Sequence, residues 1–317
     1  MDNKTMIEKA TMTLSDLASG GLMNPQQFGK FYRKIIDQPT IVNEARTVPM
    51  NSDQMKIEKI GFGQRILRVG QEATALTEAQ RSKPATGKVE LNAKEVIAEV
   101  NISYDTLENN IEKDSLQNTI VDMLAERSAL DIEELVVNGN TALAATDPYL
   151  GLFDGLRKQA TSHVVDEAGG SFARGVLKDL YGAVPAKYLR DATAFRYYMS
   201  NLNELNWRDE IAARQTNLGD TTLTGTNRPN AYGIPVEGIA MLQPYDYGET
   251  EPKTKVSDIL LTHPQNIILG VSRNVRLEFD KDIRSRSFII VLTMKLDAKF
   301  EEEDAVAKAI NVKHEIK

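Results

Sequence analysis

The segment that most constrains the fold is residues 285–300, which reads SRSFIIVLTMKLDAKF. Side chains of a strand point alternately to the two faces of a sheet. Five apolar residues of this segment therefore share one face: Phe288, Ile290, Leu292, Met294 and Leu296. Ile289 and Val291 add apolar side chains on the opposite face, which is typical of a strand covered on both sides. We expect a long strand in the centre of a sheet.

The clearest helix lies within residues 114–140, DSLQNTIVDMLAERSALDIEELVVNGN. Asp114 and Gln117 have the spacing of a capping box, and Asn138-Gly139 provides a C-terminal stop. An apolar stripe follows the helical period: Leu116, Ile120, Val121, Leu124, Ile132, Leu135 and Val136. At a rise of about 1.5 Å per residue, this helix would be roughly 35 Å long. Such a helix can support a flat subunit.

Shorter elements lie between this helix and the long strand. We predict helices at 177–188 and from the Ser200 cap to about 213, and strands at 194–199, 232–241 and 257–262. Residues 217–229 are rich in Thr, Gly and Asn, which is typical of an exposed loop. Strands and helices that segregate in this way favour an α+β fold over a doubly wound sheet.

Residues 63–103 have the pattern of a long β-hairpin. Two arms of alternating apolar residues, 65–69 and 88–103, flank polar and small residues. A further strand-like arm spans 55–62. A two-stranded ribbon is marginal in water because its outer edges are unpaired, and the tip at 74–86 has no obvious partner within the chain. We expect the tip to contact another molecule; the alternative is an ordinary surface loop.

Residues 1–50 are predicted to form an arm rather than a domain. Apolar residues at helical spacing indicate a short amphipathic helix that stops at Gly20-Gly21: Met6, Ile7, Ala10, Leu14 and Leu17. A second apolar stripe follows within residues 25–37: Phe28, Phe31, Tyr32, Ile35 and Ile36. So short an element cannot cover this much apolar surface alone, and we expect it to dock on a partner.

The composition is that of a globular protein. Of the 317 residues, 41% are apolar and 26% are charged, and the formal net charge is −7. This acidic balance does not indicate a dedicated nucleic-acid-binding surface. The chain has no cysteine, which excludes disulfides and thiolate sites. The first twenty residues lack the apolar run of a signal peptide, and no segment is long and apolar enough to span a bilayer.

A search for chemistry finds no enzyme. The three histidines, His163, His263 and His314, lie far apart in unrelated contexts and suggest no metal site. Walker, GxGxxG, GxSxG and HExxH motifs are absent. The carboxylates of Glu133-Glu134 and of residues 301–304 are predicted to lie on solvated faces, and Trp207 and the tyrosines at 197 and 198 to be core or interface aromatics. We expect no catalytic, cofactor-binding or metal-binding residues.

Four sequence segments, which occur in this order along the chain, carry a resemblance to a known protein family: VNISYDTLENN, LVVNGN, YGIPVEGIAM and RLEFDKDIRSRSFIIVLTMKLDAKF. Together with the order of elements, they resemble the major capsid protein of tailed double-stranded DNA bacteriophages, which has the Hong Kong 97 fold. The resemblance covers nearly the whole chain. It implies four parts: an N-terminal arm at 1–50, an extended loop at 51–103, a peripheral domain at 104–174 and 273–303, and an axial domain at 175–272 and 304–317.

The resemblance also implies intersubunit contacts. In this family the extended loop lies across a neighbouring subunit, and the N-terminal arm reaches neighbours. The implied contact residues are Thr74, Leu76, Thr77, Arg81, Lys83 and Pro84 in the loop tip, and Phe28, Phe31, Tyr32 and Ile35 in the arm. Burial of each such apolar side chain contributes about 1.5 to 3 kcal/mol. Because the contact repeats in every subunit, assembly into a closed shell is expected to be cooperative.

The implied function is an icosahedral head built from hexamers and pentamers around double-stranded DNA, which the shell contacts non-specifically. The implied partners are copies of the same chain, a separate scaffolding protein, a portal protein and a decoration protein, with no membrane. The expected location is the virion, assembled in the cytoplasm of the bacterial host. An acidic wall suits this role, because a strongly basic wall would retain the phosphates during packaging.

The chain departs from some relatives in two ways. It lacks their long N-terminal scaffolding region, so we expect no proteolytic trimming there. A few relatives link Lys to Asn covalently with the help of a Glu, but residues 287–294, SFIIVLTM, contain neither Asn nor Glu, although Lys83 and Lys88 occur in the loop. We therefore expect no covalent cross-links.

Rival functions remain open at this point. An encapsulin, the shell of a bacterial nanocompartment, has the same fold and encloses cargo enzymes, but usually has a more compact N-terminus. An enzyme with an unrecognised site and a soluble binding module are alternatives of other classes. Particle size separates these two classes from a shell protein, whereas the fold alone does not separate the two kinds of shell.

Overall fold

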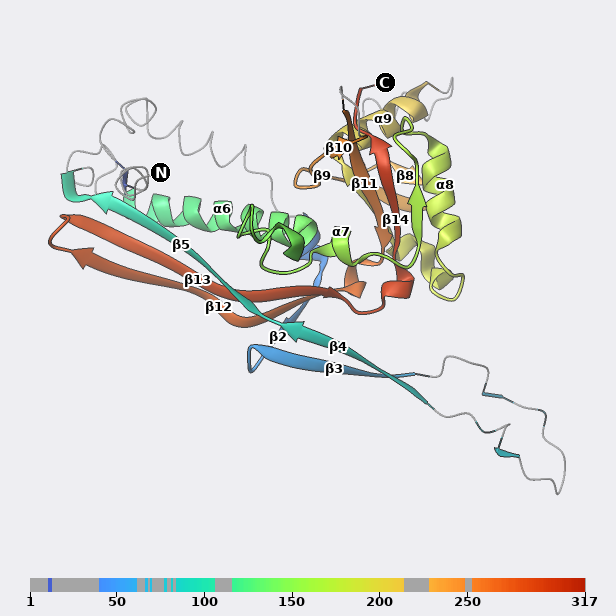
Figure 1. Ribbon diagram of the computed structural model, residues 1–317, viewed down its shortest axis with the longest axis horizontal. Coiled ribbons are helices and arrows are strands. Elements are labelled where there is room, and N and C mark those ends of the chain that lie inside the picture. Colours follow the sequence, from blue (N-terminus) through green and yellow to red (C-terminus); the bar gives the residue numbers. More distant parts are fainter. Residues whose placement is uncertain are drawn as a thin grey trace.

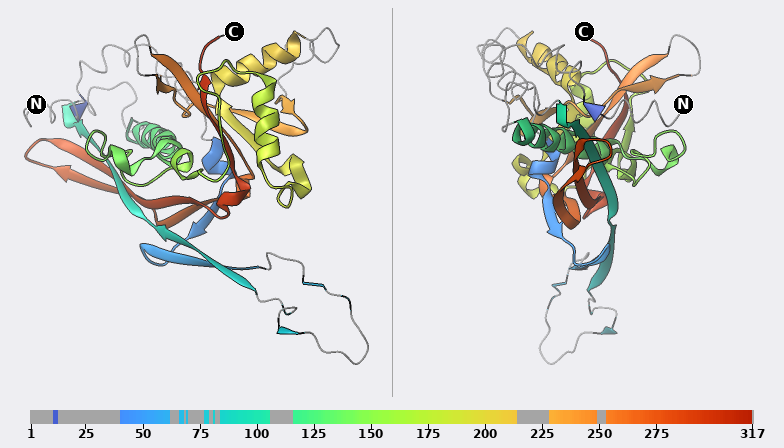
Figure 2. Two further views of the ribbon diagram at one scale, coloured as in Figure 1. Left: turned by 45° about the vertical axis from the view of Figure 1, so that its right-hand side comes forward. Right: turned by 90° about the vertical axis from the view of Figure 1, so that its left-hand side faces the viewer.

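The computed structural model describes residues 11–12, 40–61, 66–67, 69, 77–78, 81, 84–105, 116–213, 228–248 and 253–316. These residues form two β-sheets, a separate two-stranded hairpin and the helices that cover the sheets (Figure 1). The hairpin extends away from the body of the molecule, as two further views show (Figure 2). The result is an elongated subunit with one long projection.

The first sheet has five strands in the order β1-β5-β13-β12-β2. Their bounds are β1 Thr11–Met12, β5 Lys94–Ser103, β13 Ser287–Phe300, β12 Ile267–Asp282 and β2 Arg46–Pro49. The predicted long strand is β13, and its central position in this sheet is confirmed. It pairs antiparallel with both β5 and β12.

Helix α6, Leu116–Asn138, packs along one face of this sheet (Figure 1). At one end Ile120 packs with Phe288 and Ile290 of β13. At the other end Leu135 and Val136 pack in a larger core with Leu296. The predicted helix is confirmed, and its C-terminal stop at Asn138-Gly139 is confirmed as well. Asp114 of the predicted capping box lies outside the described residues.

The opposite face of the five-stranded sheet differs from the prediction. Ile289 and Val291 of β13 are only half-buried, whereas Thr293 on the same face is buried, so the described residues leave this face partly uncovered around Ile289 and Val291. Sequence alternation identified both apolar faces correctly, but it does not reveal which face a helix of the same subunit will cover.

The second sheet has seven strands. Six follow the order β6-β14-β11-β7-β9-β8, and β10 pairs with β11. Their bounds are β6 Val164–Asp166, β7 Arg196–Ser200, β8 Asn230–Ala231, β9 Ile234–Ile239, β10 Tyr245–Tyr247, β11 Thr254–Thr262 and β14 Ala307–Lys313. Two short helices, α4 Thr40–Glu44 and α7 Leu156–Gln159, lie near its junction with the first sheet.

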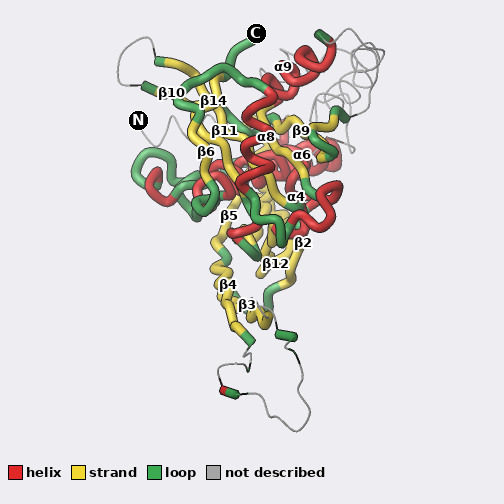
Figure 3. The backbone as a smooth tube through the Cα atoms, turned by 90° about the vertical axis from the view of Figure 1, so that its right-hand side faces the viewer, coloured by secondary structure: helices red, strands yellow, loops and turns green. Residues whose placement is uncertain are grey.

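Two adjacent tyrosines show how the second sheet is covered. Tyr197 is fully buried in a core with α8, Arg174–Ala183, and α9, Asn201–Ala212. Helix α8 lies against β14, and α9 lies against β7 and β9 (Figure 3). Tyr198 points to the other face and is fully buried in the core that contains the end of α6. Trp207 is 4% exposed in the α8–α9 core. The prediction that these aromatics are core residues is confirmed.

The hairpin consists of β3, Gln54–Gly61, and β4, Ala85–Asn92. The further strand-like arm predicted at 55–62 corresponds to β3. Residues 66, 67 and 69 of the predicted arm at 65–69 are not in a strand, and the predicted arm at 88–103 is divided between β4 and β5. The chain leaves the hairpin at Ala93, and β5 pairs with β13 in the five-stranded sheet instead. The alternation of apolar residues continues through both β4 and β5, so the pattern could not show that the two strands have different partners.

Three other predictions differ from the structure. Thr11 and Met12 form a strand parallel to β5 rather than part of a helix, because pairing with the sheet edge satisfies their backbone instead. The boundary placed between residues 272 and 273 falls inside the continuous strand β12, and β6, placed in the peripheral domain, pairs with β14 of the second sheet. Of the exposed loop predicted at 217–229, residues 217–227 lie outside the described residues.

Candidate functional site

The root of the hairpin is fastened to the five-stranded sheet. The backbone N–H of Asn92 donates to Oδ2 of Asp297 at 2.7 Å. The carboxylate of Asp53 accepts from Lys295 Nζ at 2.8 Å and from Ser272 Oγ at 2.9 Å. Asp297 is 1% exposed, and burial raises the pKa of its carboxyl group. The hairpin is thus hydrogen-bonded to the sheet at its root, through the buried Asp297 and the exposed Asp53.

Further along the hairpin, both strands present exposed surface. In the described residues β3 and β4 pair only with each other, so each has one unpaired edge. On one face Lys56 forms an ion pair with Glu90 at 2.8 Å. The apolar side chains of Ile60, Leu67 and Val69 are 73%, 83% and 90% exposed. Exposed apolar side chains next to unpaired strand edges mark a surface for another chain.

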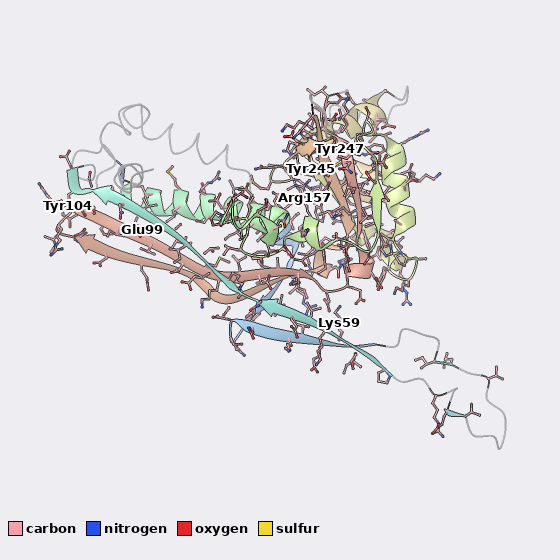
Figure 4. The ribbon with its side chains drawn as sticks, in the orientation of Figure 1. Lys59, Glu99, Tyr104, Arg157, Tyr245 and Tyr247 are labelled. Carbon is pink, nitrogen blue, oxygen red and sulfur yellow. The ribbon has the colours of Figure 1, made fainter. Side chains whose placement is uncertain are left out.

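A second surface of interest is the face of the five-stranded sheet that points away from α6. In the register of the sheet, Val291 lies between Glu99 of β5 and Glu278 of β12. One pair further along, Ile289 lies between Asn101 and Asp280. Figure 4 shows Glu99 on β5. We call this surface, Ile97, Glu99, Asn101, Glu278, Asp280, Ile289 and Val291, the outer sheet face. Ile97 is 62% exposed.

The structure places only some of the predicted contact residues. Thr77, Arg81 and Pro84 are exposed, which is consistent with a contact surface but does not test one. The remaining predicted tip residues, Thr74, Leu76 and Lys83, lie outside the described residues, as do the predicted arm residues Phe28, Phe31, Tyr32 and Ile35. Sequence reasoning missed the outer sheet face, because its acidic residues come from two strands about 180 residues apart and meet only through the sheet register.

A buried polar network joins the two sheets. Arg157 of α7 donates from Nε to Asp258 Oδ2 at 2.9 Å and from Nη1 to Asn138 Oδ1 at 2.8 Å. Tyr245 donates to the other oxygen of Asp258 at 2.8 Å, and the Arg157 guanidinium lies over its ring (Figure 4). Burial and the Asp258 charge raise the pKa of the Tyr245 phenol. These residues line an open pocket of about 370 Å³.

The other side of the junction holds a second polar group. Arg228 lies 2.8 Å from Glu237 of β9 and 3.4 Å from Glu44 of α4. Tyr198 donates to Glu44 at 3.1 Å. Glu237 is 5% exposed, and burial, followed by the nearby Glu44, raises the pKa of its carboxyl group. Both networks position the two sheets relative to each other, and neither brings together a nucleophile and a base.

The structure shows the contacts of several residues that the search of the sequence for catalytic groups considered. His263 Nδ1 accepts from the backbone N–H of Gln265 in a turn, and His314 Nδ1 lies 3.2 Å from Ser200 Oγ. Glu133 was predicted to lie on a solvated face, which is wrong: it is 3% exposed and accepts from the backbone N–H of Ile41 at 2.7 Å. Within the described ranges, no group of three His, Asp or Glu side chains is placed to hold a metal ion.

The carboxylates of residues 301–304 are structural contacts. Glu301 pairs with Arg46, Glu302 with Lys59 of the hairpin, and Asp304 with Lys187. Glu303 accepts from the backbone N–H groups of Thr161 and Ser162. Each therefore fastens the chain between β13 and β14 to a neighbouring element. Of the helices that the structure describes, none combines the length and apolar character needed to cross a bilayer.

Comparison with known proteins gives the class to which this fold belongs. No protein-family model matches the chain. The chain is 60% identical over 313 residues to a protein of Bacillus subtilis (strain 168) named "Putative prophage capsid protein YqbE", and the match covers 99% of this chain and 100% of the relative. The chain therefore belongs to the family of prophage capsid proteins.

Solved structures agree on the fold. A chain of the satellite phage P4 procapsid is similar with a TM-score of 0.64 and 15% identity, covering 99% of this chain and 97% of that one. The capsid of Ralstonia phage GP4 is similar at 0.63 and 11%, covering 88% and 89%. The SrpI encapsulin of Synechococcus elongatus PCC 7942 is similar at 0.61 and 12%, covering 96% and 99%.

The predicted α+β fold of the Hong Kong 97 type is confirmed, and so is the predicted resemblance to phage major capsid proteins. The chain is a phage capsid protein, a structural component of the virion rather than an enzyme. The long helix α6, the sheet beneath it and the projecting hairpin are thus elements of a shell subunit.

Proposed function

We propose that this chain assembles through hexamers and pentamers into a closed icosahedral shell that encloses double-stranded DNA. The observation that carries the proposal is the projecting hairpin β3–β4. It leaves unpaired strand edges exposed on a single subunit, together with the apolar side chains of Ile60 on β3 and of Leu67 and Val69 between β3 and β4. Membership of the prophage capsid family supplies the class of assembly. A neighbouring copy would cover this surface.

The outer sheet face is the surface we propose for that contact. Residues 65–88 contain five basic and two acidic residues, so this part of the hairpin carries a formal charge of +3. The outer sheet face carries Glu99, Glu278 and Asp280 beside the half-buried Ile289 and Val291. Opposite charge around an apolar centre is the usual composition of a specific interface. The hairpin tip of one copy would therefore dock on the outer sheet face of the next.

The predicted contact residues belong to the same proposal. In the tip they are Thr74, Leu76, Thr77, Arg81, Lys83 and Pro84, and in the arm Phe28, Phe31, Tyr32 and Ile35. The arm would reach further subunits. The two sheets support a division in which the five-stranded sheet and α6 form the peripheral domain, the seven-stranded sheet with α8 and α9 forms the axial domain, and residues 51–93 form the extended loop.

Other partners follow from the same role. A scaffolding protein, a portal protein and a decoration protein would complete the head, and assembly would take place in the cytoplasm of the bacterial host. The contact with DNA would be non-specific, because the chain carries a net charge of −7 and so offers little attraction to phosphate.

Electron microscopy of the purified full chain, with light scattering after size exclusion, tests the assembly. Closed shells or ring-shaped capsomers are expected. A monomer or dimer under several salt conditions and with scaffolding protein present would contradict the proposal.

A charge-reversal pair tests the docking surface. Arg81→Glu with Lys83→Glu should prevent shell formation while leaving the subunit folded. The matched control, Lys178→Glu with Arg190→Glu, changes the net charge equally on exposed residues outside the hairpin and should leave assembly intact. Normal shells from the first pair would overturn the docking proposal.

An encapsulin-type shell is the second candidate, favoured by the structural similarity to SrpI. The contents of native particles separate the two functions. Nuclease-protected double-stranded DNA is expected for the phage head. A protein cargo held on the inner wall, with no nucleic acid, would support the nanocompartment instead.

A further inference from the structure

The hairpin is attached to its own subunit at two separated places. At its root, Asp53 accepts from Lys295 Nζ of β13 at 2.8 Å, and the backbone N–H of Asn92 donates to Asp297. Further along β3, Lys59 pairs with Glu302 at 3.1 Å (Figure 4). Asp53 and Lys59 are six residues apart, which corresponds to roughly 20 Å along a strand. Two attachments at this separation fix the direction of the hairpin relative to the subunit, whereas a single attachment would let the hairpin pivot.

The root also contains an unusually close apolar contact. Leu91 of β4 is 1% exposed and packs with Met50 and Ile268. Beneath it lies Gly270 of β12, whose position in the register is directly opposite Asp297 of β13. A Cβ atom at Gly270 would lie 2.8 Å from Met50 Sδ and 2.9 Å from Leu91 Cδ1. These distances are too short for real contacts, so any side chain at position 270 must displace Met50 Sδ and Leu91 Cδ1 from their positions against β12.

We propose that Gly270 and Asp297 are positioning residues that set the angle at which the hairpin leaves its subunit, and that this angle sets the curvature of the shell. Because Gly270 has no side chain, β4 can lie close to the sheet. Asp297 accepts a hydrogen bond from the backbone of β4 at Asn92 and so keeps β4 at that distance from the sheet. Every subunit uses the same hairpin contact, so a small tilt at the root recurs around the whole particle. The link to curvature rests on the proposed shell assembly; the link to the hairpin angle does not.

The first test measures the angle in the unassembled subunit. The chain has no cysteine, so spin labels can be attached at two introduced sites alone, Thr86→Cys on β4 and Asp280→Cys on β12, both exposed positions. Gly270→Ala should shift the distance distribution between the labels. Adding Leu91→Val, which removes the atom nearest to the new methyl group apart from Met50 Sδ, should return the distribution toward that of the labelled parent. An unchanged distribution in Gly270→Ala would overturn the proposal.

The matched control is Gly182→Ala in α8. A Cβ at Gly182 meets no atom within 4 Å, so the distance distribution and the shells should match those of the parent. If Gly270→Ala does not fold, Asp297→Asn provides the second variant: it keeps the shape of the side chain but removes the charge that accepts from Asn92, and it should broaden the distribution. A distribution as narrow as the parent's would contradict the role of Asp297.

The second test measures the shell. Gly270→Ala is expected to give particles of changed diameter or open sheets, and the Leu91→Val combination to restore the parent diameter. A shifted label distance with unchanged particle diameter would overturn the link to curvature and keep the link to the hairpin angle. If the unaltered chain forms no shells at all, the proposed function fails, while the label distances still decide the role of Gly270.

Discussion

Arg157 and Asp258 form an ion pair across the junction between the two sheets, with 2.9 Å between Nε and Oδ2. Their side chains are 16% and 7% exposed. Arg157 also donates to Asn138, the last residue of α6. One guanidinium therefore joins the long helix of the first sheet to strand β11 of the second. The orientation of the two sheets depends on a contact from which most water is excluded.

Replacing Arg157 by Gln should strongly destabilise the subunit. The substitution leaves the buried charge of Asp258 without its ion-pair partner, which typically costs about 3 to 5 kcal/mol. Chemical unfolding of the unassembled subunit measures the change. Lys255→Gln is the matched control, because its ion pair with Asp246 is about half exposed and should contribute little to stability in high-dielectric surroundings. Equal losses in the two variants would contradict this account.

Glu237 gives a pH-dependent prediction. Burial and Glu44 raise the pKa of its carboxyl group in the folded state, so the folded chain binds this proton more tightly than the unfolded chain does. Its charged form thus lowers stability at neutral pH, and this loss disappears as the pH falls through the raised pKa. The thermal unfolding midpoint of Glu237→Gln should therefore be higher than that of the parent at pH 7, and the difference between the two midpoints should be smaller at pH 5. A variant less stable at pH 7 would show that the Arg228 ion pair outweighs the cost of burial.

Local patterns predicted the long elements well. The apolar stripe and the Asn138-Gly139 stop located α6 to within two residues at each end, because a helix buries a face that its own sequence determines. The two-sided pattern of residues 285–300 likewise identified a central strand. The N-cap role of Ser200 also followed from local sequence, and its side chain accepts from the backbone N–H of Asn203.

Partners distant in the sequence could not be predicted in this way. The alternation in β4 continues into β5, so nothing local shows that the first strand pairs with β3 and the second with β13. Glu133 is buried, and its carboxylate accepts a hydrogen bond from the backbone N–H of Ile41, which is 92 residues away in the sequence. The acidic residues of the outer sheet face are brought together by the register between β5, β13 and β12, and side-chain periodicity alone does not determine that register.

Truncation of Leu135 tests the core that supports α6. Its side chain is fully buried among residues of both sheets. Leu135→Ala should lower the free energy of unfolding by about 2 to 5 kcal/mol, since it removes buried methyl groups and leaves a cavity. Leu205 of α9 is 48% exposed, and Leu205→Ala should change stability by no more than about 0.5 kcal/mol. Urea unfolding of both variants measures the contrast, and a loss below about 1 kcal/mol for Leu135→Ala would contradict the packing described.

Mature shells should contain no covalent cross-links between subunits. A link from Lys to Asn requires the amine to attack the side-chain amide and release ammonia, with a carboxylate to accept a proton. Residues 287–294 of β13 contain neither Asn nor Glu. Boiling purified shells in detergent should therefore give one band of 35.2 kDa on a denaturing gel.

A ladder of multiples of that mass would refute this expectation, and the structure indicates where its source would lie. Asn101 and Glu99 of β5 are neighbours on the outer sheet face, with the Asn101 amide nitrogen 3.2 Å from Glu99 Oε1. They lie beside Ile289 and Val291 in the register. Loss of the ladder in Asn101→Asp would assign the link to this pair, because a carboxylate does not release ammonia, whereas a persisting ladder would place it elsewhere in the shell.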